Sequence, residues 1–252
     1  MESTQKPKIE LAKKILPGPL FQSLEHIFKQ DTQNSTVLVG GTALSGFYSG
    51  HRRSDDIDLF TRNEMAQKAT VLACKSLSAI GVQFYDEFQT AQFYKTLCDF
   101  RNHKFTIDVV CDPHFFELAQ FIILENGICI ADLKTILMTK ASTLVSRCSE
   151  KDLYDLLWLF EHYNQLNISE LVSLGEKIDA GVNGETMLLS ISGTKLRESA
   201  CNFSLLPNAT AHNIYQDLLT FQKELIYELE NYLKKLSPKP LKELIKKIKN
   251  LK

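Results

Sequence analysis

The sequence predicts an α+β protein in which a lobe built on a mixed β-sheet is followed by a mainly helical lobe. Short β-branched and aromatic runs dominate residues 36–110, and segments with helical spacing dominate the chain after residue 133. The 252 residues, 44% of them hydrophobic, are enough to bury a core in one large domain or two small ones. We expect a helical lead-in at 1–35, an α/β core at 36–130 and a helical lobe at 131–252.

Composition and charge exclude several classes of protein. A net charge of −1 with normal apolar content does not fit a mostly disordered chain. No apolar stretch reaches the roughly 18 residues that a membrane span needs, and the polar start at 1–7 is not a secretory signal. We therefore expect a cytoplasmic protein with no membrane partner. The scattered cysteines favour buried free thiols over zinc or redox chemistry (Cys74, Cys98, Cys111, Cys129, Cys148 and Cys201).

The first third of the chain contains a strand that leads into a glycine turn. Helical spacing at 11–30 is interrupted by a Pro-Gly-Pro sequence at 17–19. The β-branched run Thr36–Val39 predicts a buried strand, and Gly40 and Gly41 after it predict a tight turn. The next residues, 42–48, have the pattern of the first turns of a helix.

The remaining predicted elements are mostly strands up to residue 130 and helices after it. Residues 57–61 predict a strand, and 63–80 predict a helix that Asn63 caps. Further strands are predicted at 82–85, 93–97, 105–110 and 128–130. Helices are predicted at 133–146, 151–163, 168–180, 188–201 and 212–235.

The last twenty residues are strongly basic. They carry eight lysines against Glu243, a net charge of +7, so the rest of the chain sums to −8. Apolar residues recur there at helical spacing (241, 244, 245, 248 and 251), which predicts an amphipathic helix after Pro238 and Pro240. Two interpretations stay open: a terminal helix docked on the core with a solvated lysine face, or a contact with a nucleic-acid backbone.

A pair of acidic residues carries the clearest chemical signal. Asp56 and Asp58 alternate with Ile57 and Leu59, so in a strand both carboxylates project from one face, about 6.6–7 Å apart, and the apolar residues point into the core. Two adjacent carboxylates repel each other unless a cation lies between them. Mg²⁺ takes one or two carboxylates together with substrate phosphates, so the pair predicts a magnesium site, with Mn²⁺ as the alternative ion.

Two further features complete the predicted site. Asp108 lies in the strand predicted at 105–110, where an aspartate is disfavoured, and beside Asp56 and Asp58 it would complete a site for two metals in phosphoryl-type transfer. Upstream, the small residues Gly40 and Gly41, with Thr42 after them, let backbone N–H groups approach a phosphate.

Several motifs resemble one family. Gly40 to Leu44, His51 to Phe60, Lys140 with Ala141, Arg147, and Lys151 to Leu156 together resemble the AbiEii/AbiGii toxin family of the polymerase-β-type nucleotidyltransferase superfamily. The matches span roughly residues 36–160. The resemblance implies a nucleotidyltransferase fold and transfer of a nucleoside monophosphate from an NTP.

The resemblance also implies roles for individual residues. Asp56 and Asp58 match the metal-binding pair, and Asp108 matches the third carboxylate by its strand context only. Thr42 stands where the superfamily has a serine, and Arg52 and Ser54 match the motif with either phosphate contact or loop shaping as their role. Lys140 matches a lysine that grips the triphosphate, and Asp152 the acid that accompanies it.

Each candidate also has a purely structural interpretation. Asp56 and Asp58 could belong to a capped turn and a surface strand, and Asp108 could be an ordinary buried carboxylate paired with a nearby donor. Lys140 could form a structural ion pair. Asp152 and Asp155 could be acids in the first turn of a helix, which the helix dipole favours.

Three functions are compatible with the sequence. The first is a Mg²⁺-dependent nucleotidyltransferase that acts on RNA, with the tRNA 3′ end as a known acceptor among relatives, as the toxin of a toxin–antitoxin or phage-defence pair with a cognate antitoxin. The second is transfer to a small molecule such as an aminoglycoside, which the acidic body permits. The third is an inactive module of the same fold that binds a nucleotide or a partner.

Overall fold

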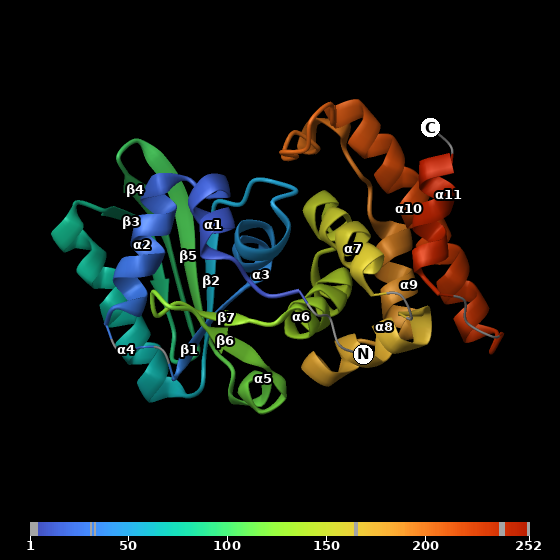
Figure 1. Cartoon of the computed structure of the whole chain (residues 1–252). Coiled ribbons are helices and arrows are strands. Elements are labelled where there is room, and N and C mark those ends of the chain that lie inside the picture. Colours follow the sequence, from blue (N-terminus) through green and yellow to red (C-terminus); the bar gives the residue numbers. More distant parts are fainter. Residues whose placement is uncertain (1–4, 31, 33, 164–165, 237–239, 251–252) are drawn as a thin grey trace. The chain divides into compact units, whose positions relative to one another are not determined.

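The computed structural model describes residues 5–30, 32, 34–163, 166–236 and 240–250 (Figure 1). The chain divides into two compact units. Gln5–Ile136 is called the sheet unit, and Leu137–Lys252 is called the helical unit. None of the helices in the described ranges is both long and apolar enough to cross a membrane.

The sheet unit contains seven strands and the helices that cover them. Its elements in chain order are α1 (Ile9–Ile15), α2 (Gly18–Phe28), β1 (Thr36–Val39), α3 (Gly40–Thr42), the π-helical segment η1 (Ala43–Ser49), β2 (Asp56–Thr61), α4 (Glu64–Lys75), the 3₁₀ segment η2 (Ser76–Ile80), β3 (Gln83–Gln89), β4 (Phe93–Phe100), β5 (His103–Cys111), α5 (Pro113–Leu118), β6 (Phe121–Ile123) and β7 (Cys129–Ala131).

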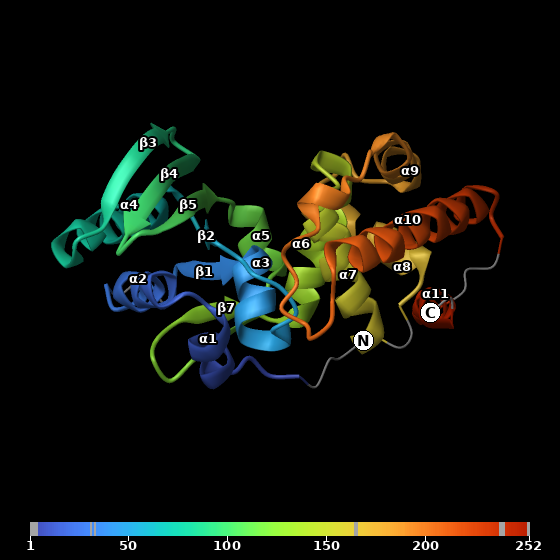
Figure 2. The same ribbon diagram turned by 90° about the horizontal axis from the view of Figure 1, so that it is seen from above.

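The seven strands form one mixed sheet in the order β3-β4-β5-β2-β1-β7-β6. β2 pairs with β5 and β1 with β7 in parallel, and the other neighbours are antiparallel. The helices α2 and α4 pack on one face of the sheet (Figure 2). On that face the hydroxyls of Thr36 in β1 and Thr70 in α4 form a hydrogen bond of 2.6 Å. Ile57 and Leu59 are fully buried on this face, so the alternate residues of β2 lie on the other.

Most predicted elements of the sheet unit are confirmed, and two were missed. The helix break at residues 17–19 separates α1 from α2, and Asn63 caps α4 by accepting a hydrogen bond from Ala66 N at 2.9 Å. The helix α5 and the short strand β6 were not predicted. The start of α5 does carry local signals, because Asp112 accepts a hydrogen bond from Phe115 N at 2.9 Å and Pro113 occupies the first turn. The described cysteines are free thiols, and all except Cys111 are buried.

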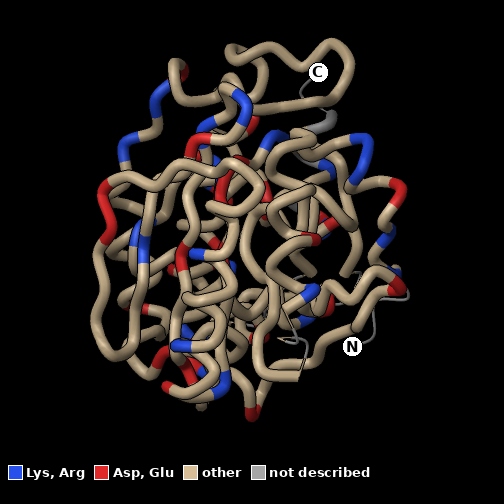
Figure 3. Tube along the Cα trace, turned by 90° about the vertical axis from the view of Figure 1, so that its left-hand side faces the viewer, with Lys and Arg blue, Asp and Glu red and all other residues tan. Residues whose placement is uncertain are grey.

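In Figure 3, which faces the sheet unit, acidic and basic positions are interspersed along the chain.

The helical unit contains most of α6 (Leu133–Ser146) and all of α7 (Glu150–His162), α8 (Ile168–Ile178), α9 (Gly184–Gly193), the 3₁₀ segment η3 (Glu198–Ala200), α10 (Ala211–Leu233) and α11 (Lys242–Asn250). The long helix α10 packs against α7, α8, α9 and α11, and it is therefore central to this unit.

The predicted helix at 188–201 is wrong in its boundaries. The helix α9 begins at Gly184 because Asn183 caps it, accepting hydrogen bonds from Glu185 N and Thr186 N at 3.0 Å each. It ends at Gly193, because glycine is a poor helix former, and the 3₁₀ segment η3 follows separately.

The basic tail contains the predicted terminal helix. The helix α11 packs against α7 and α10, and Leu241, Ile245 and Ile248 are buried. The docked helix is therefore confirmed, although Lys239 and Lys252 of the predicted lysine cluster lie outside the described residues.

Candidate active site

The two acids of β2 lie on the same face of the sheet. Asp56 and Asp58 are half-buried, and the alternate residues Ile57 and Leu59 are fully buried beneath the helices. This confirms the predicted alternation. The strand thus presents two carboxylates on the face that α4 leaves uncovered.

The neighbouring strand β5 adds a hydroxyl and a third carboxylate. The parallel register pairs Asp56 with Thr106 and Asp58 with Asp108. Thr106 Oγ1 donates a hydrogen bond of 2.7 Å to Asp56 Oδ1, which fixes the orientation of that carboxylate. Asp58 and Asp108 lie directly opposite each other on adjacent strands, which are about 4.8 Å apart in any sheet.

The glycine turn after β1 lies directly against this face. Gly40 has a positive φ of 71°, and a Cβ there would lie 2.0 Å from Asp58 Oδ2. A Cβ on Gly41 would lie 2.4 Å from Arg52 Nη2 and 3.0 Å from Ser54 Oγ. Position 40 therefore requires glycine, and the close approach of the turn to the Asp58 carboxylate depends on it, whereas a side chain at Gly41 would displace Arg52 and Ser54.

Thr42, Ser54 and Arg52 tie the glycine turn to β2. Thr42 Oγ1 donates to Ser54 Oγ at 3.0 Å and lies in hydrogen-bond contact with the backbone oxygen of Asp56. Arg52 is buried, and its Nη1 donates to the backbone oxygen of Arg53 at 2.8 Å. The structure brings these three residues together at the turn, in contacts that hold the loop in shape.

Asp108 is paired with a lysine of the next strand. Lys95 on β4 lies opposite Asp108 in the antiparallel β4–β5 register, and its Nζ is 3.2 Å from Asp108 Oδ2. The Lys95 side chain is 49% exposed and that of Asp108 is 22% exposed, so solvent reaches this ion pair.

The other two predicted site residues, Lys140 and Asp152, meet inside the helical unit. Lys140 Nζ lies 3.0 Å from Asp152 Oδ1 and 2.7 Å from Asp155 Oδ2. All three side chains are at most 3% exposed. These residues of α6 and α7 form the cluster called here the buried ion cluster.

Asp152 has a second structural role at the start of α7. Ser149 caps the helix, and Asp152 Oδ2 accepts hydrogen bonds from Ser149 N at 3.2 Å and Ser149 Oγ at 2.6 Å, which completes a capping box. Arg147 Nε donates to the same oxygen at 3.1 Å. Burial alone would raise the pKa of Asp152, but the charges of Lys140 and Arg147 and the Ser149 hydrogen bond outweigh it and lower the pKa to about 2.

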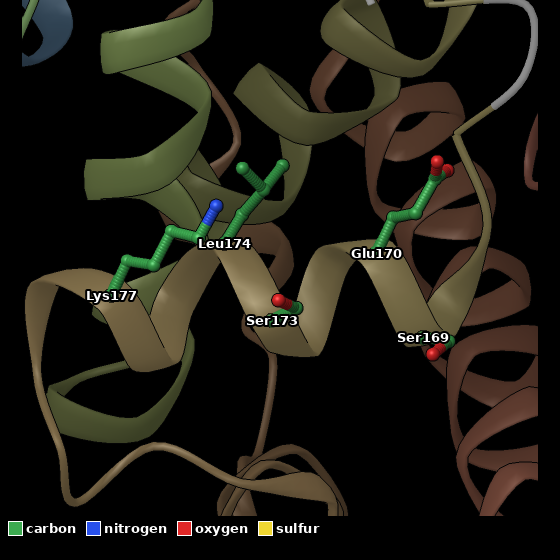
Figure 4. Close-up of a pocket in the computed structure, with 5 residues that line it drawn as sticks. All are labelled: Ser169, Glu170, Ser173, Leu174 and Lys177. Carbon is green, nitrogen blue, oxygen red and sulfur yellow. The ribbon is translucent and has the colours of Figure 1, made fainter. Parts of the chain in front are cut away.

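A surface pocket on α8 contains none of the predicted site residues. Ser169, Glu170, Ser173, Leu174 and Lys177 line it (Figure 4). Glu170 serves the cap of its own helix, since Glu170 Oε2 accepts a hydrogen bond from Asn167 N at 3.1 Å.

The donor atoms of Asp56 and Asp58 fit a hard divalent cation. Within the described ranges, no group of three or more His, Cys, Asp or Glu side chains converges in a way that could hold a metal ion. A complete protein cage is not what Mg²⁺ requires, because it binds one or two carboxylates and completes its shell with water and phosphates. The pair beside the glycine turn matches that requirement.

The sequence analysis gave no site role to three residues that contact the predicted ones. Thr106 orients Asp56, Lys95 pairs with Asp108, and Asp155, taken as a helix acid, shares Lys140 with Asp152. Only Asp155 carried a local signal, because its spacing of three residues from Asp152 places both on one side of α7.

A carboxylate pair on a strand beside a glycine turn is the arrangement expected of a nucleotidyltransferase. The sequence over residues 22–218 matches the family described as "Nucleotidyl transferase AbiEii toxin, Type IV TA system". The chain belongs to this family of toxin–antitoxin nucleotidyltransferases, and it is an enzyme of that class.

Similar proteins occur in several bacteria. An uncharacterized protein of Aquifex aeolicus (strain VF5) is 31% identical over 169 residues, which are 62% of this chain and 72% of the relative. The crystal structure of a putative nucleotidyltransferase from H. pylori is 18% identical, covers 86% of this chain and 99% of that chain, and has a TM-score of 0.49. MenT4, a nucleotidyltransferase toxin from Mycobacterium tuberculosis H37Rv, is 14% identical, covers 88% and 90%, and has a TM-score of 0.46.

Proposed function

We propose that the protein transfers a nucleoside monophosphate from an NTP to a hydroxyl of RNA, with the tRNA 3′ end as the first acceptor to test. In this proposal it acts in the cytoplasm as the toxin of a type IV toxin–antitoxin pair, and the antitoxin is a separate protein. The observation that carries the proposal is the position of Asp56 and Asp58 on one face of β2, against the glycine turn.

Different residues of the sheet unit would bind the metal ion and the triphosphate. Asp56 and Asp58 would hold Mg²⁺, or Mn²⁺ in its place, and the bound ion supplies charge neutralisation at the reacting phosphate. Gly40 lets the turn lie directly against the Asp58 carboxylate, so its backbone would be close to a triphosphate bound at the metal pair. Thr42 keeps that turn on β2 through its hydrogen bonds to Ser54 and to the backbone of Asp56.

Five further residues of the predicted site keep proposed roles. Asp108 is the carboxylate that accepts the proton of the acceptor hydroxyl, and its Oδ2 lies 3.2 Å from Lys95 Nζ. The resemblance assigns Lys140 to the triphosphate and Asp152 to its orientation, and in this structure both belong to the buried ion cluster, with a hydrogen bond of 3.0 Å between them. Arg52 and Ser54 shape the loop that carries the glycine turn.

The direct test is transfer of label from each α-³²P NTP to purified tRNA in the presence of Mg²⁺. We expect the wild type to label the RNA and Asp56→Ala to lose at least about 100-fold of the rate. Asp99→Ala is the matched control, because Asp99 is a half-buried acid on β4. It is in cross-strand register with Lys104, and not with any of the proposed site residues. It should keep the wild-type rate.

Other outcomes would reject the proposal. Label on an aminoglycoside in place of RNA would identify a small-molecule transferase. Equal labelling by the wild type and Asp56→Ala would exclude this carboxylate from the reaction. If Mg²⁺-NTP also failed to raise the melting temperature, the chain would be an inactive module, because a ligand that binds the folded state stabilises it.

A further inference from the structure

A row of three charged side chains crosses three strands on the open face of the sheet. Asp58 on β2 is opposite Asp108 on β5, and Asp108 is opposite Lys95 on β4. Residues in direct register on adjacent strands project from the same face. The row therefore runs from the proposed metal pair to a lysine that the predicted site did not include.

The two carboxylates of this row have contacts on opposite sides. Asp58 Oδ2 reaches the position that a Cβ of Gly40 would occupy, on the β1 side of β2. Asp108 Oδ2 lies 3.2 Å from Lys95 Nζ, on the β4 side of β5. One oxygen of each carboxylate is thus held away from the other carboxylate.

The sheet fixes Lys95 in this place. The β4–β5 hairpin pairs every residue from Phe93 with Val110 to Phe100 with His103, so the backbone register holds Lys95 opposite Asp108. The turn between the strands has only two residues, Arg101 and Asn102, and both have the positive φ that such a tight turn needs. Asp56, by comparison, faces the neutral hydroxyl of Thr106.

We propose that Lys95 is a positioning residue that keeps Asp108 out of the carboxylate set that binds the divalent cation. This inference rests on the proposed function. With NTP bound, one cation lies on Asp56 and Asp58, and Asp108 stays a lysine-paired carboxylate. A second divalent cation on Asp108 would have to approach the Lys95 ammonium, which repels it. This differs from the predicted role of Asp108 as a third metal ligand.

The test counts bound cations. Equilibrium dialysis with Mn²⁺ and the α,β-methylene analogues of the four NTPs gives the ratio of bound Mn²⁺ to bound nucleotide. We expect a ratio of about one for the wild type and about two for Lys95→Met, because the ammonium that repels a second cation from Asp108 is gone. Lys95→Arg should restore a ratio of about one, since it keeps the positive charge.

Two further variants test which carboxylates bind the Mn²⁺ ion. Asp108→Asn should leave the ratio and the affinity for Mn²⁺ within about threefold of the wild type, and Asp58→Asn should weaken binding at least about tenfold. Lys104→Met is the matched control, because Lys104 is an exposed lysine on the same face of β5, opposite Asp99, and it should not change the ratio.

The outcomes separate this inference from the proposed function. A ratio that is the same in the wild type and Lys95→Met, or a ratio of two in the wild type, overturns the role of Lys95 and leaves the nucleotidyltransferase site intact. If neither the wild type nor Lys95→Met retains Mn²⁺ with the nucleotide, the metal site of the proposed function fails, and the role of Lys95 fails with it.

Discussion

Two lysine–aspartate contacts in this protein have similar distances and different surroundings. In the helical unit, Lys140 Nζ lies 2.7 Å from Asp155 and 3.0 Å from Asp152, and no side chain of the three is more than 3% exposed. In the sheet unit, Lys95 Nζ lies 3.2 Å from Asp108, and the two side chains are 49% and 22% exposed. Similar distances thus occur in a buried ion pair and in one that solvent reaches.

The difference in burial determines what each pair can do. Removing one partner from a buried pair leaves an uncompensated charge without water, which costs about 3–5 kcal/mol. An exposed pair contributes only about 0–1 kcal/mol, because water and salt screen it. The buried ion cluster therefore contributes to the stability of its unit, and the acids of the sheet face remain accessible to solvent and to a ligand.

The largest effect should come from the sheet face, on activity and not on stability. Asp58→Asn keeps the shape of the side chain and removes one charge of the proposed metal pair. We expect nucleotide transfer to fall about 10³-fold and the free energy of unfolding to change by less than about 1 kcal/mol. Steady-state labelling of tRNA and urea denaturation measure the two quantities. A large loss of stability would show that Asp58 belongs with the buried acids.

In the helical unit the same kind of change should mainly affect stability. Lys140→Met leaves Asp152 and Asp155 buried side by side, so we expect the free energy of unfolding to fall by about 3 kcal/mol in urea denaturation. The control Lys134→Met removes an exposed lysine from the same helix, α6, and should change it by less than about 0.5 kcal/mol. A stable Lys140→Met variant that no longer binds NTP would mean that Lys140 serves the triphosphate alone.

The buried ion cluster should also make stability depend on pH. Asp152 has a pKa of about 2 in the folded protein, below its ordinary value of 3.8. A lowered pKa contributes stability above pH 4, and this contribution is lost as the pH falls from about 4 towards 2. The contribution is about 2 kcal/mol.

The measurement compares unfolding free energies at pH 5 and pH 2.5. Asp152→Asn should lose less stability over this range than the wild type, by about 2 kcal/mol, because it has no carboxylate to protonate. Glu185→Gln removes an exposed acid from the start of α9 and serves as the control. An unchanged slope in Asp152→Asn would contradict the low pKa.

The contrast between the two regions also explains what the sequence could predict. The common face of Asp56 and Asp58 follows from the two-residue period of a strand, so it needs no knowledge of neighbours. The helix that holds Asp152 was predicted from its spacing. In both cases the information lies within one segment of the chain.

The missed contacts depend on which segments meet. Thr106 reaches Asp56 only because β2 and β5, 50 residues apart, pair in one particular register. Lys95 meets Asp108 because the turn at Arg101 and Asn102 has two residues, and it lacks the glycine that normally reveals such a turn in a sequence. Burial of Lys140 likewise depends on α6 approaching α7, which no single helix can indicate.

The smallest expected effect concerns the contribution of the exposed Lys95–Asp108 pair to the free energy of unfolding. Lys95→Met should change the free energy of unfolding by less than about 0.5 kcal/mol, because a half-exposed pair is screened by solvent. Raising the salt concentration should reduce even this difference, since screening acts on exposed charges first. Urea denaturation at low and high salt measures it, with Lys104→Met as the reference. A loss near that of Lys140→Met would place Lys95 and Asp108 among the structural ion pairs, and the sheet face would then differ from the buried ion cluster in exposure alone.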